Sequence, residues 1–113
     1  ISCSLVGSEM CIRDRGYTLL EDCGFTRNEA VRATGQLVMR NIENVLEAGC
    51  DGALTGPIER NDIETVKKHI ACMQNDYSDD VRLYKMLGTK LVNIAEKKNP
   101  DKDYTQMMEL LRG

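Results

Sequence analysis

The chain has 113 residues, of which 29% are charged and 42% hydrophobic, with a formal net charge of −3. An acidic balance with interspersed signs argues against a nucleic-acid partner or an anionic membrane surface. No apolar stretch approaches the ~20 residues of a membrane-spanning helix, so we expect one small domain without a membrane segment.

The N-terminal segment, residues 1–15, has mixed charge and no periodic pattern. Its core, residues 5–14, is similar to the translation of a transposase-based sequencing adapter read in frame. A secretory signal peptide is the alternative, but charges such as Glu9 and Arg13 interrupt any apolar run and no basic residue precedes it. We therefore expect residues 1–15 to be an adapter-derived, disordered artefact and the native start to lie upstream.

Three cysteines lie beyond this segment, Cys23, Cys50 and Cys72. Their number is odd, their spacing is wide and they form no paired motif. This usage is typical of a reducing compartment rather than of a disulfide framework, which favours a cytoplasmic location.

The remaining sequence is helical in pattern, and no stretch alternates for long enough to form a strand. Residues 16–23 indicate the end of a helix, which Gly24 stops. Thr26 and Glu29 form a capping box, and apolar or small residues then recur at helical spacing as far as Leu46. Gly49 supplies a C-terminal stop. The longest predicted helix therefore runs for about 20 residues.

Three further helices are expected after this one. Asp62 is a candidate N-cap for the first, and Ser78 for the second, which ends before Pro100. Asp103 is a weaker capping signal for a short last helix. The prediction is an all-α bundle of four or five helices around the long helix.

The densest group of polar residues lies in the loop between residues 53 and 62. One interpretation is a helix-to-helix connection with an ordinary cap, and residue types alone favour it. The other is a ligand-pocket wall, in which Thr55 supplies a hydroxyl, Gly56 allows backbone to approach a ligand and Arg60 holds a carboxylate or phosphate.

His69, the only histidine, stands three residues before Cys72 on one helix face. Structural zinc needs four ligands, so we expect no metal site. The default interpretation is that His69 borders the apolar stripe and hydrogen-bonds a loop; the alternative is that it lines a pocket. Spacing selects no catalytic acid or base among His69, Tyr84, Tyr104 and the carboxylates. The chain has no glycine-rich phosphate loop, so it is expected to hold no cofactor by itself.

Residues 19–69 resemble the C-terminal helical domain, of unknown function, of Rossmann-like NAD(P)-dependent oxidoreductase homologues. The most specific part is Ala53-Leu54-Thr55-Gly56-Pro57-Ile58, followed by Arg60, Asp62, Thr65-Val66 and His69. A more distant similarity is to pyrroline-5-carboxylate reductase, in which a loop after a long helix lines the substrate pocket across a dimer. Thr55-Gly56-Pro57 occupies the similar place here.

The resemblance implies a fold similar to the 6-phosphogluconate dehydrogenase C-terminal domain. Residues 16–113 would form the helical dimerisation and substrate-pocket domain, while a separate N-terminal Rossmann domain would hold NAD(P). The implied partners are that domain, a second copy and a small-molecule substrate. The implied substrate-binding residues are Thr55, Gly56, Pro57, Arg60 and His69. The alternative is a non-catalytic interaction or dimerisation module of a nucleotide-sensing Rossmann-like protein.

Overall fold

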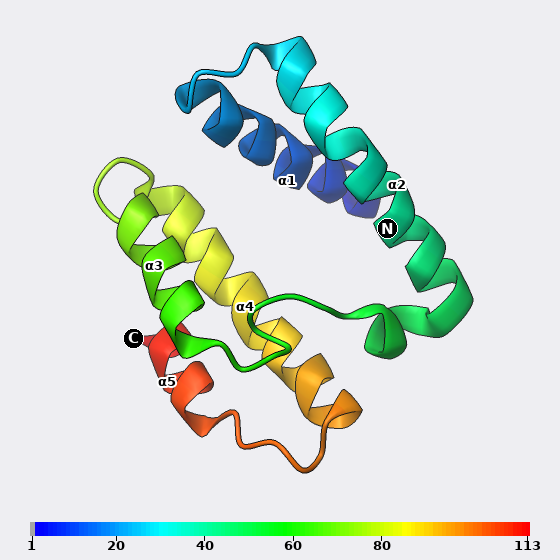
Figure 1. The fold of residues 1–113 in the computed structure, drawn as a ribbon, viewed down its shortest axis with the longest axis vertical. Helices are drawn as coiled ribbons and strands as arrows, with labels where there is room; N and C mark the ends of the chain where they lie inside the picture. Colours follow the sequence, from blue (N-terminus) through cyan, green and yellow to red (C-terminus); the bar gives the residue numbers. More distant parts are fainter. Residues whose placement is uncertain (1) are drawn as a thin grey trace. The chain divides into compact units, whose positions relative to one another are not determined.

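The helices follow the predicted order along the chain. The computed structural model describes residues 2–113, with side chains described from residue 7 onward. Over this range there is no strand, which confirms the all-α class (Figure 1). The chain divides into two units, Ile1–Glu43 and Asn44–Gly113. The helices are α1 (Ser2–Asp22), α2 (Arg27–Ala53), α3 (Ile63–Met73), α4 (Ser78–Lys98) and α5 (Thr105–Arg112).

The first unit contains α1, a tight turn and most of α2. Gly24 takes a φ of 105° in the turn, where a side chain would be strained. The capping box is confirmed: the Glu29 N–H donates to Thr26 Oγ1 at 3.1 Å, and the Thr26 N–H donates to Glu29 Oε1 at 3.1 Å. Each bond gives a partner to a backbone N–H at the start of α2 that has no acceptor within the helix.

Residues 2–15 are helical, whereas disorder was expected, and they form the first part of α1. They continue the helix of residues 16–22, and extending an existing helix adds a hydrogen bond for each residue fixed. Arg13 also pairs with Glu9 one turn earlier. Ile1 lies outside the described residues.

Gly49 interrupts the long helix at the predicted stop, and a short helical segment follows it. Its φ of 76° and ψ of 171° are non-helical, and α2 resumes after it as far as Ala53. Glycine tolerates positive φ, so the interruption becomes a kink.

The predicted apolar face of α2 is largely solvent-accessible. Ala30 is fully buried, but Leu37 is 70% exposed and Leu46 is 81% exposed. Helical spacing therefore identified this apolar face, but only part of the face is buried. None of the described helices is long and apolar enough to cross a membrane.

The hydrophobic core of the second unit is formed by α3, α4, α5 and the loop that precedes α3. Met107 and Val92 are fully buried, and Leu111 is 2% exposed. Gly88 on α4 permits close packing, because a Cβ there would lie 2.9 Å from Leu111 Cδ2. The buried cluster comprises Ile58, Val66, Ile70, Val81, Val92, Ala95, Tyr104, Met107 and Leu111.

Of the three N-caps predicted in this unit, one occupies its predicted position. Asp62 caps α3 as predicted, accepting from the Thr65 N–H at 3.1 Å. Tyr104 rather than Asp103 is the N-cap of α5, although the Asp103 carboxylate accepts from the Thr105 N–H at 2.9 Å. Ser78 is not the cap of α4: it is the first helical residue, and Tyr77 occupies the N-cap without a side-chain cap bond.

Candidate functional site at the loop between α2 and α3

The loop that leads from Ala53 into α3 folds on itself through backbone hydrogen bonds. The Arg60 N–H donates to the Gly56 carbonyl at 3.0 Å, and the Asp62 N–H donates to the Pro57 carbonyl at 2.8 Å. Gly56 has a φ of 105°, which favours glycine at this turn. Ile58 is buried in the core and fixes the middle of the loop.

A polar network from the C-terminal part of the chain holds the loop. The Tyr104 hydroxyl donates to the Glu59 carbonyl at 2.6 Å. The Asn99 side-chain amide donates to Glu59 Oε1 at 3.0 Å and to the Tyr104 hydroxyl oxygen at 3.1 Å. Lys98 Nζ donates to the Leu54 carbonyl at 2.7 Å. The three bonds to Glu59 and Leu54 join residues that are 40 or more positions apart in the sequence, so the loop is part of the tertiary structure.

The carboxylate of Glu59 is stabilised in its charged form within this network. The hydrogen bond from Asn99 lowers the pKa of Glu59, and the nearby Lys98 ammonium lowers it further. Lys98 Nζ lies 3.7 Å from Glu59 Oε1, and the Glu59 side chain is 13% exposed. Glu59 therefore acts as a fixed internal charge of the loop.

Asn61 adds a second link between the loop and α5. Its side-chain amide donates to the Asp103 carbonyl at 2.9 Å. Its φ is 60°, a left-handed conformation that asparagine adopts more readily than most residues. The side-chain oxygen of Asn61 is buried and has no hydrogen-bond partner.

The predicted site residues lie on the outer side of this loop. Thr55 and Arg60 are exposed, whereas Gly56 and Pro57 are half-buried. Within the described residues, the Arg60 guanidinium makes no ion pair closer than 4 Å. The Asp62 carboxylate already occupies the start of α3. Hydrogen bonds from Thr65 lower its pKa and the Arg60 guanidinium lowers it further, so Arg60 rather than the helix terminus is the exposed cationic group here.

The hydrogen bond of His69 goes to a residue of α4, whereas the default expectation was a hydrogen bond to a loop. Its Nδ1 lies 2.9 Å from the hydroxyl oxygen of Tyr84 on α4, and the two rings pack edge to face with centroids 5.8 Å apart. Burial raises the pKa of the half-buried Tyr84. The two side chains together can hold and exchange a proton, although Tyr84 was not predicted to be the partner of His69.

Sequence reasoning missed the residues that hold the loop. Tyr104 was considered from the sequence as a possible acid or base, but it is 3% exposed and its hydroxyl binds the loop backbone. Lys98 was assigned no role from the sequence. A buried tyrosine usually finds a partner for its hydroxyl, and that was the one available signal.

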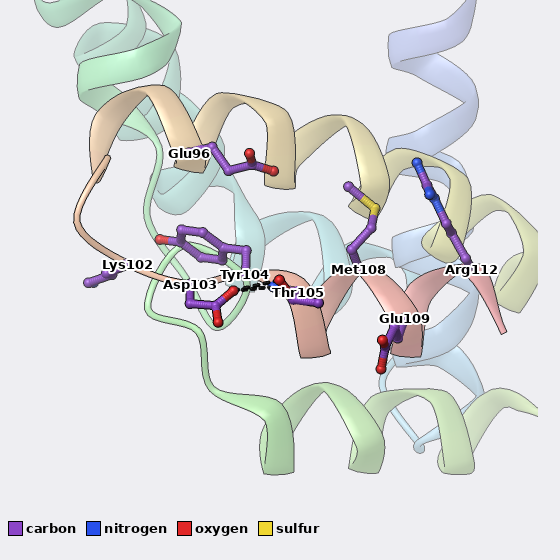
Figure 2. A pocket seen from close by; sticks show the side chains of 8 residues that line it. All are labelled: Glu96, Lys102, Asp103, Tyr104, Thr105, Met108, Glu109 and Arg112. Carbon is purple, nitrogen blue, oxygen red and sulfur yellow. Dashed lines mark hydrogen bonds between the residues drawn. The ribbon is translucent and has the colours of Figure 1, made fainter.

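A separate hollow of about 450 Å³ lies between α4 and α5 (Figure 2). It contains none of the predicted site residues. Figure 2 shows the Asp103 carboxylate bonded to Thr105 at its edge. In the part of the chain that the structure describes, no group of three metal-ligating side chains is present. The lining residues are Glu96, Lys102, Asp103, Tyr104, Thr105, Met108, Glu109 and Arg112.

Comparison with known proteins identifies one family. No curated protein and no solved structure matches the chain significantly. The profile of a family described as "Domain of unknown function (DUF2520)" matches residues 10–91. The matched range includes the loop, Arg60, His69 and Tyr84, and it begins inside the segment that is similar to an adapter. The chain belongs to the DUF2520 family.

Proposed function

We propose that this chain is the helical substrate-pocket and dimerisation domain of a Rossmann-like NAD(P)-dependent oxidoreductase. A dinucleotide-binding domain would hold the cofactor, which supplies the hydride. This chain would bind the substrate at Thr55, Gly56, Pro57 and Arg60, with His69 at the border of the same site. A reducing cytoplasm is the proposed location, in keeping with the free thiols of Cys23, Cys50 and Cys72.

The observation that supports this proposal is the way the loop is held. Tyr104, Asn99 and Lys98 bind its inner side, whereas Thr55 and Arg60 remain exposed. A binding site benefits when its backbone is fixed by surrounding structure, because less ordering entropy is lost on binding. The exposed guanidinium suits a carboxylate or phosphate on the substrate.

Within this proposal, the hydrogen bonds of Tyr104 and Tyr84 distinguish their possible roles in proton transfer to the substrate. Tyr104 is buried and its hydroxyl proton is donated to the Glu59 carbonyl, so it has a structural role. Tyr84 and His69 share a hydrogen bond near the surface of α3 and α4. They are the better candidates to give a proton to a carbonyl or imine as it accepts hydride.

The test uses a longer protein that contains this domain together with a dinucleotide-binding domain. Arg60→Ala should weaken binding of a carboxylate- or phosphate-bearing substrate by roughly 10- to 150-fold, the range for a hydrogen bond to a charged group. The melting temperature should hardly change, because Arg60 is exposed. Arg32→Ala removes another exposed arginine and serves as the control. If Arg60→Ala unfolds the protein but leaves affinity intact, Arg60 is a structural residue and the site is wrong.

The second candidate is a non-catalytic interaction module of a nucleotide-sensing protein. The exposed apolar side chains of α2, Leu37 and Leu46 among them, favour this role because such residues mark association surfaces. The same longer protein separates the two candidates. An enzyme would oxidise NADH or NADPH with a carbonyl or imine substrate, whereas a sensor would bind the nucleotide without turnover.

A further inference from the structure

A group of mostly polar and charged side chains lies on one face of α4. Arg82, Lys85, Met86 and Thr89 follow the i, i+3, i+4, i+7 spacing and therefore share one helix face. With Leu111 and Arg112 of α5 they line a hollow of about 310 Å³.

Close packing of α4 and α5 brings the basic residues together. Gly88 has no side chain, and Leu111 fills the space beside it with both δ-carbons within 3.1 Å of the position of a Cβ. Leu111 is 2% exposed, so this contact fixes the last turn of α5 against α4. Arg112, the next residue, then lies beside the basic face of α4, and Figure 2 shows its side chain extending from α5 toward α4.

The charges of this hollow are unbalanced. Three of its six lining residues are cations and none is a carboxylate, in a chain whose net charge is −3. Arg82 lies 3.9 Å from Asp79, but both side chains are at least 80% exposed, so water screens this pair. Lys85 and Arg112 form no ion pair in the described part of the chain. Like charges held close together favour binding of an anion.

The geometry points to a binding site for a small phosphate monoester that carries an apolar group. A phosphate monoester has close to two negative charges at neutral pH, and guanidinium groups match its oxygens in geometry. Met86 and Leu111 supply an apolar wall for the organic part. Thr89 donates its hydroxyl proton to the Met86 carbonyl at 2.7 Å, so the cations supply the donors to the phosphate.

The experiment titrates the purified chain with phenyl phosphate, inorganic phosphate or benzoate at constant ionic strength. Amide chemical shifts of Thr89 and Arg112 report binding. Phenyl phosphate is expected to saturate these shifts, inorganic phosphate to compete for the same site, and benzoate to bind at least about fivefold more weakly because of its lower charge. Arg112→Gln and Lys85→Gln should each weaken phenyl phosphate binding about fivefold, the upper range for exposed charge pairs.

Lys90→Gln is the matched control. It removes an exposed cation from α4 that does not line the hollow, so affinity should change by less than about twofold. Circular dichroism confirms that each variant is folded. Absence of saturation, equal binding of benzoate, or equal weakening by Lys90→Gln and Arg112→Gln would each overturn the proposal. The last of these results would mean diffuse attraction to the whole basic surface.

Discussion

Tyr104 and Glu59 are 45 positions apart in the sequence and are joined by a 2.6 Å hydrogen bond from the tyrosine hydroxyl to the backbone carbonyl of the glutamate. The tyrosine ring is 3% exposed and packs in the core of the second unit. One side chain therefore contributes both to the core and to the position of the candidate site.

Removing that hydroxyl should destabilise the protein. Tyr104→Phe leaves the Glu59 carbonyl without its donor, and we expect a loss of about 1–2 kcal/mol in the free energy of unfolding. Chemical denaturation measures it. Tyr17→Phe is the control, because the Tyr17 ring contacts the Arg27 guanidinium and phenylalanine keeps that ring. The free energy of unfolding of this variant should stay within about 0.5 kcal/mol of the wild-type value. Equal effects of the two substitutions would contradict the structural role of Tyr104.

Two helical glycines should respond in opposite ways to alanine. At Gly88 the new methyl group meets Leu111 Cδ2 at 2.9 Å in a packed core, and overpacking of about 1–3 kcal/mol exceeds the gain of about 1 kcal/mol in helix propensity. At Gly35 nothing lies within 4 Å, so alanine should stabilise α2 by up to about 1 kcal/mol. Thermal unfolding of both variants tests this. Stabilisation by Gly88→Ala would mean that α4 and α5 are less closely packed.

Stability should fall at acid pH partly because of Glu59. The folded pKa of this carboxyl is lowered by the Asn99 hydrogen bond and by Lys98, so its contribution is present above the unfolded pKa and is lost as pH falls through the folded pKa. Glu59→Gln should therefore flatten the dependence of the free energy of unfolding on pH in the acid range. Glu64→Gln changes an exposed glutamate of α3 and should leave the dependence as it is. Identical curves for wild type and Glu59→Gln would refute this assignment.

Deleting residues 1–15 should have little effect on the melting temperature. None of the described side chains from residue 7 to residue 15 is buried. Their ion pairs, such as Arg27 with Asp14, lie between side chains that are about half exposed and are therefore worth little. Differential scanning calorimetry of the chain starting at Gly16 measures the effect. A drop of several degrees would show that this part of α1 stabilises the first unit.

The chain should self-associate at high concentration through α2. Leu37 is 70% exposed, and Leu37→Gln should reduce association in sedimentation experiments. Met86 on α4 is 68% exposed, and Met86→Gln is the matched control, which should leave association unchanged. A wild-type chain that remains monomeric at all concentrations would contradict the proposed dimerisation.

Local signals in the sequence located the helix ends well. The Thr26–Glu29 box and the Asp62 cap act within three or four residues, so the relevant partners are visible in a short window of sequence. Ser78 shows the limit of such signals, since the cap position lies one residue earlier. Gly49 interrupts α2 as its residue type predicted, and only the short segment of residues 50–53 that follows it was not foreseen.

The candidate site was less predictable because its supports are distant in sequence. Residue types identified the loop, and the exposure of Thr55 and Arg60 is compatible with the predicted role without testing it. The bonds from Asn99 and Tyr104 depend on how α4 and α5 pack, and no local pattern encodes them. The same is true of Arg112 beside Lys85, which requires the contact of Leu111 with Gly88.

The distance in sequence between Glu59 and Tyr104 also sets the order of events during synthesis. At about 5–20 residues per second, the 45 residues from 60 to 104 take about 2–9 s to be translated. During that time the loop lacks the hydroxyl, amide and ammonium donors that fix it. A nascent chain arrested before Tyr104 would therefore expose this loop to proteases, while one that includes α5 would protect it. A residue beside α5 thus fixes a loop that was synthesised well before it.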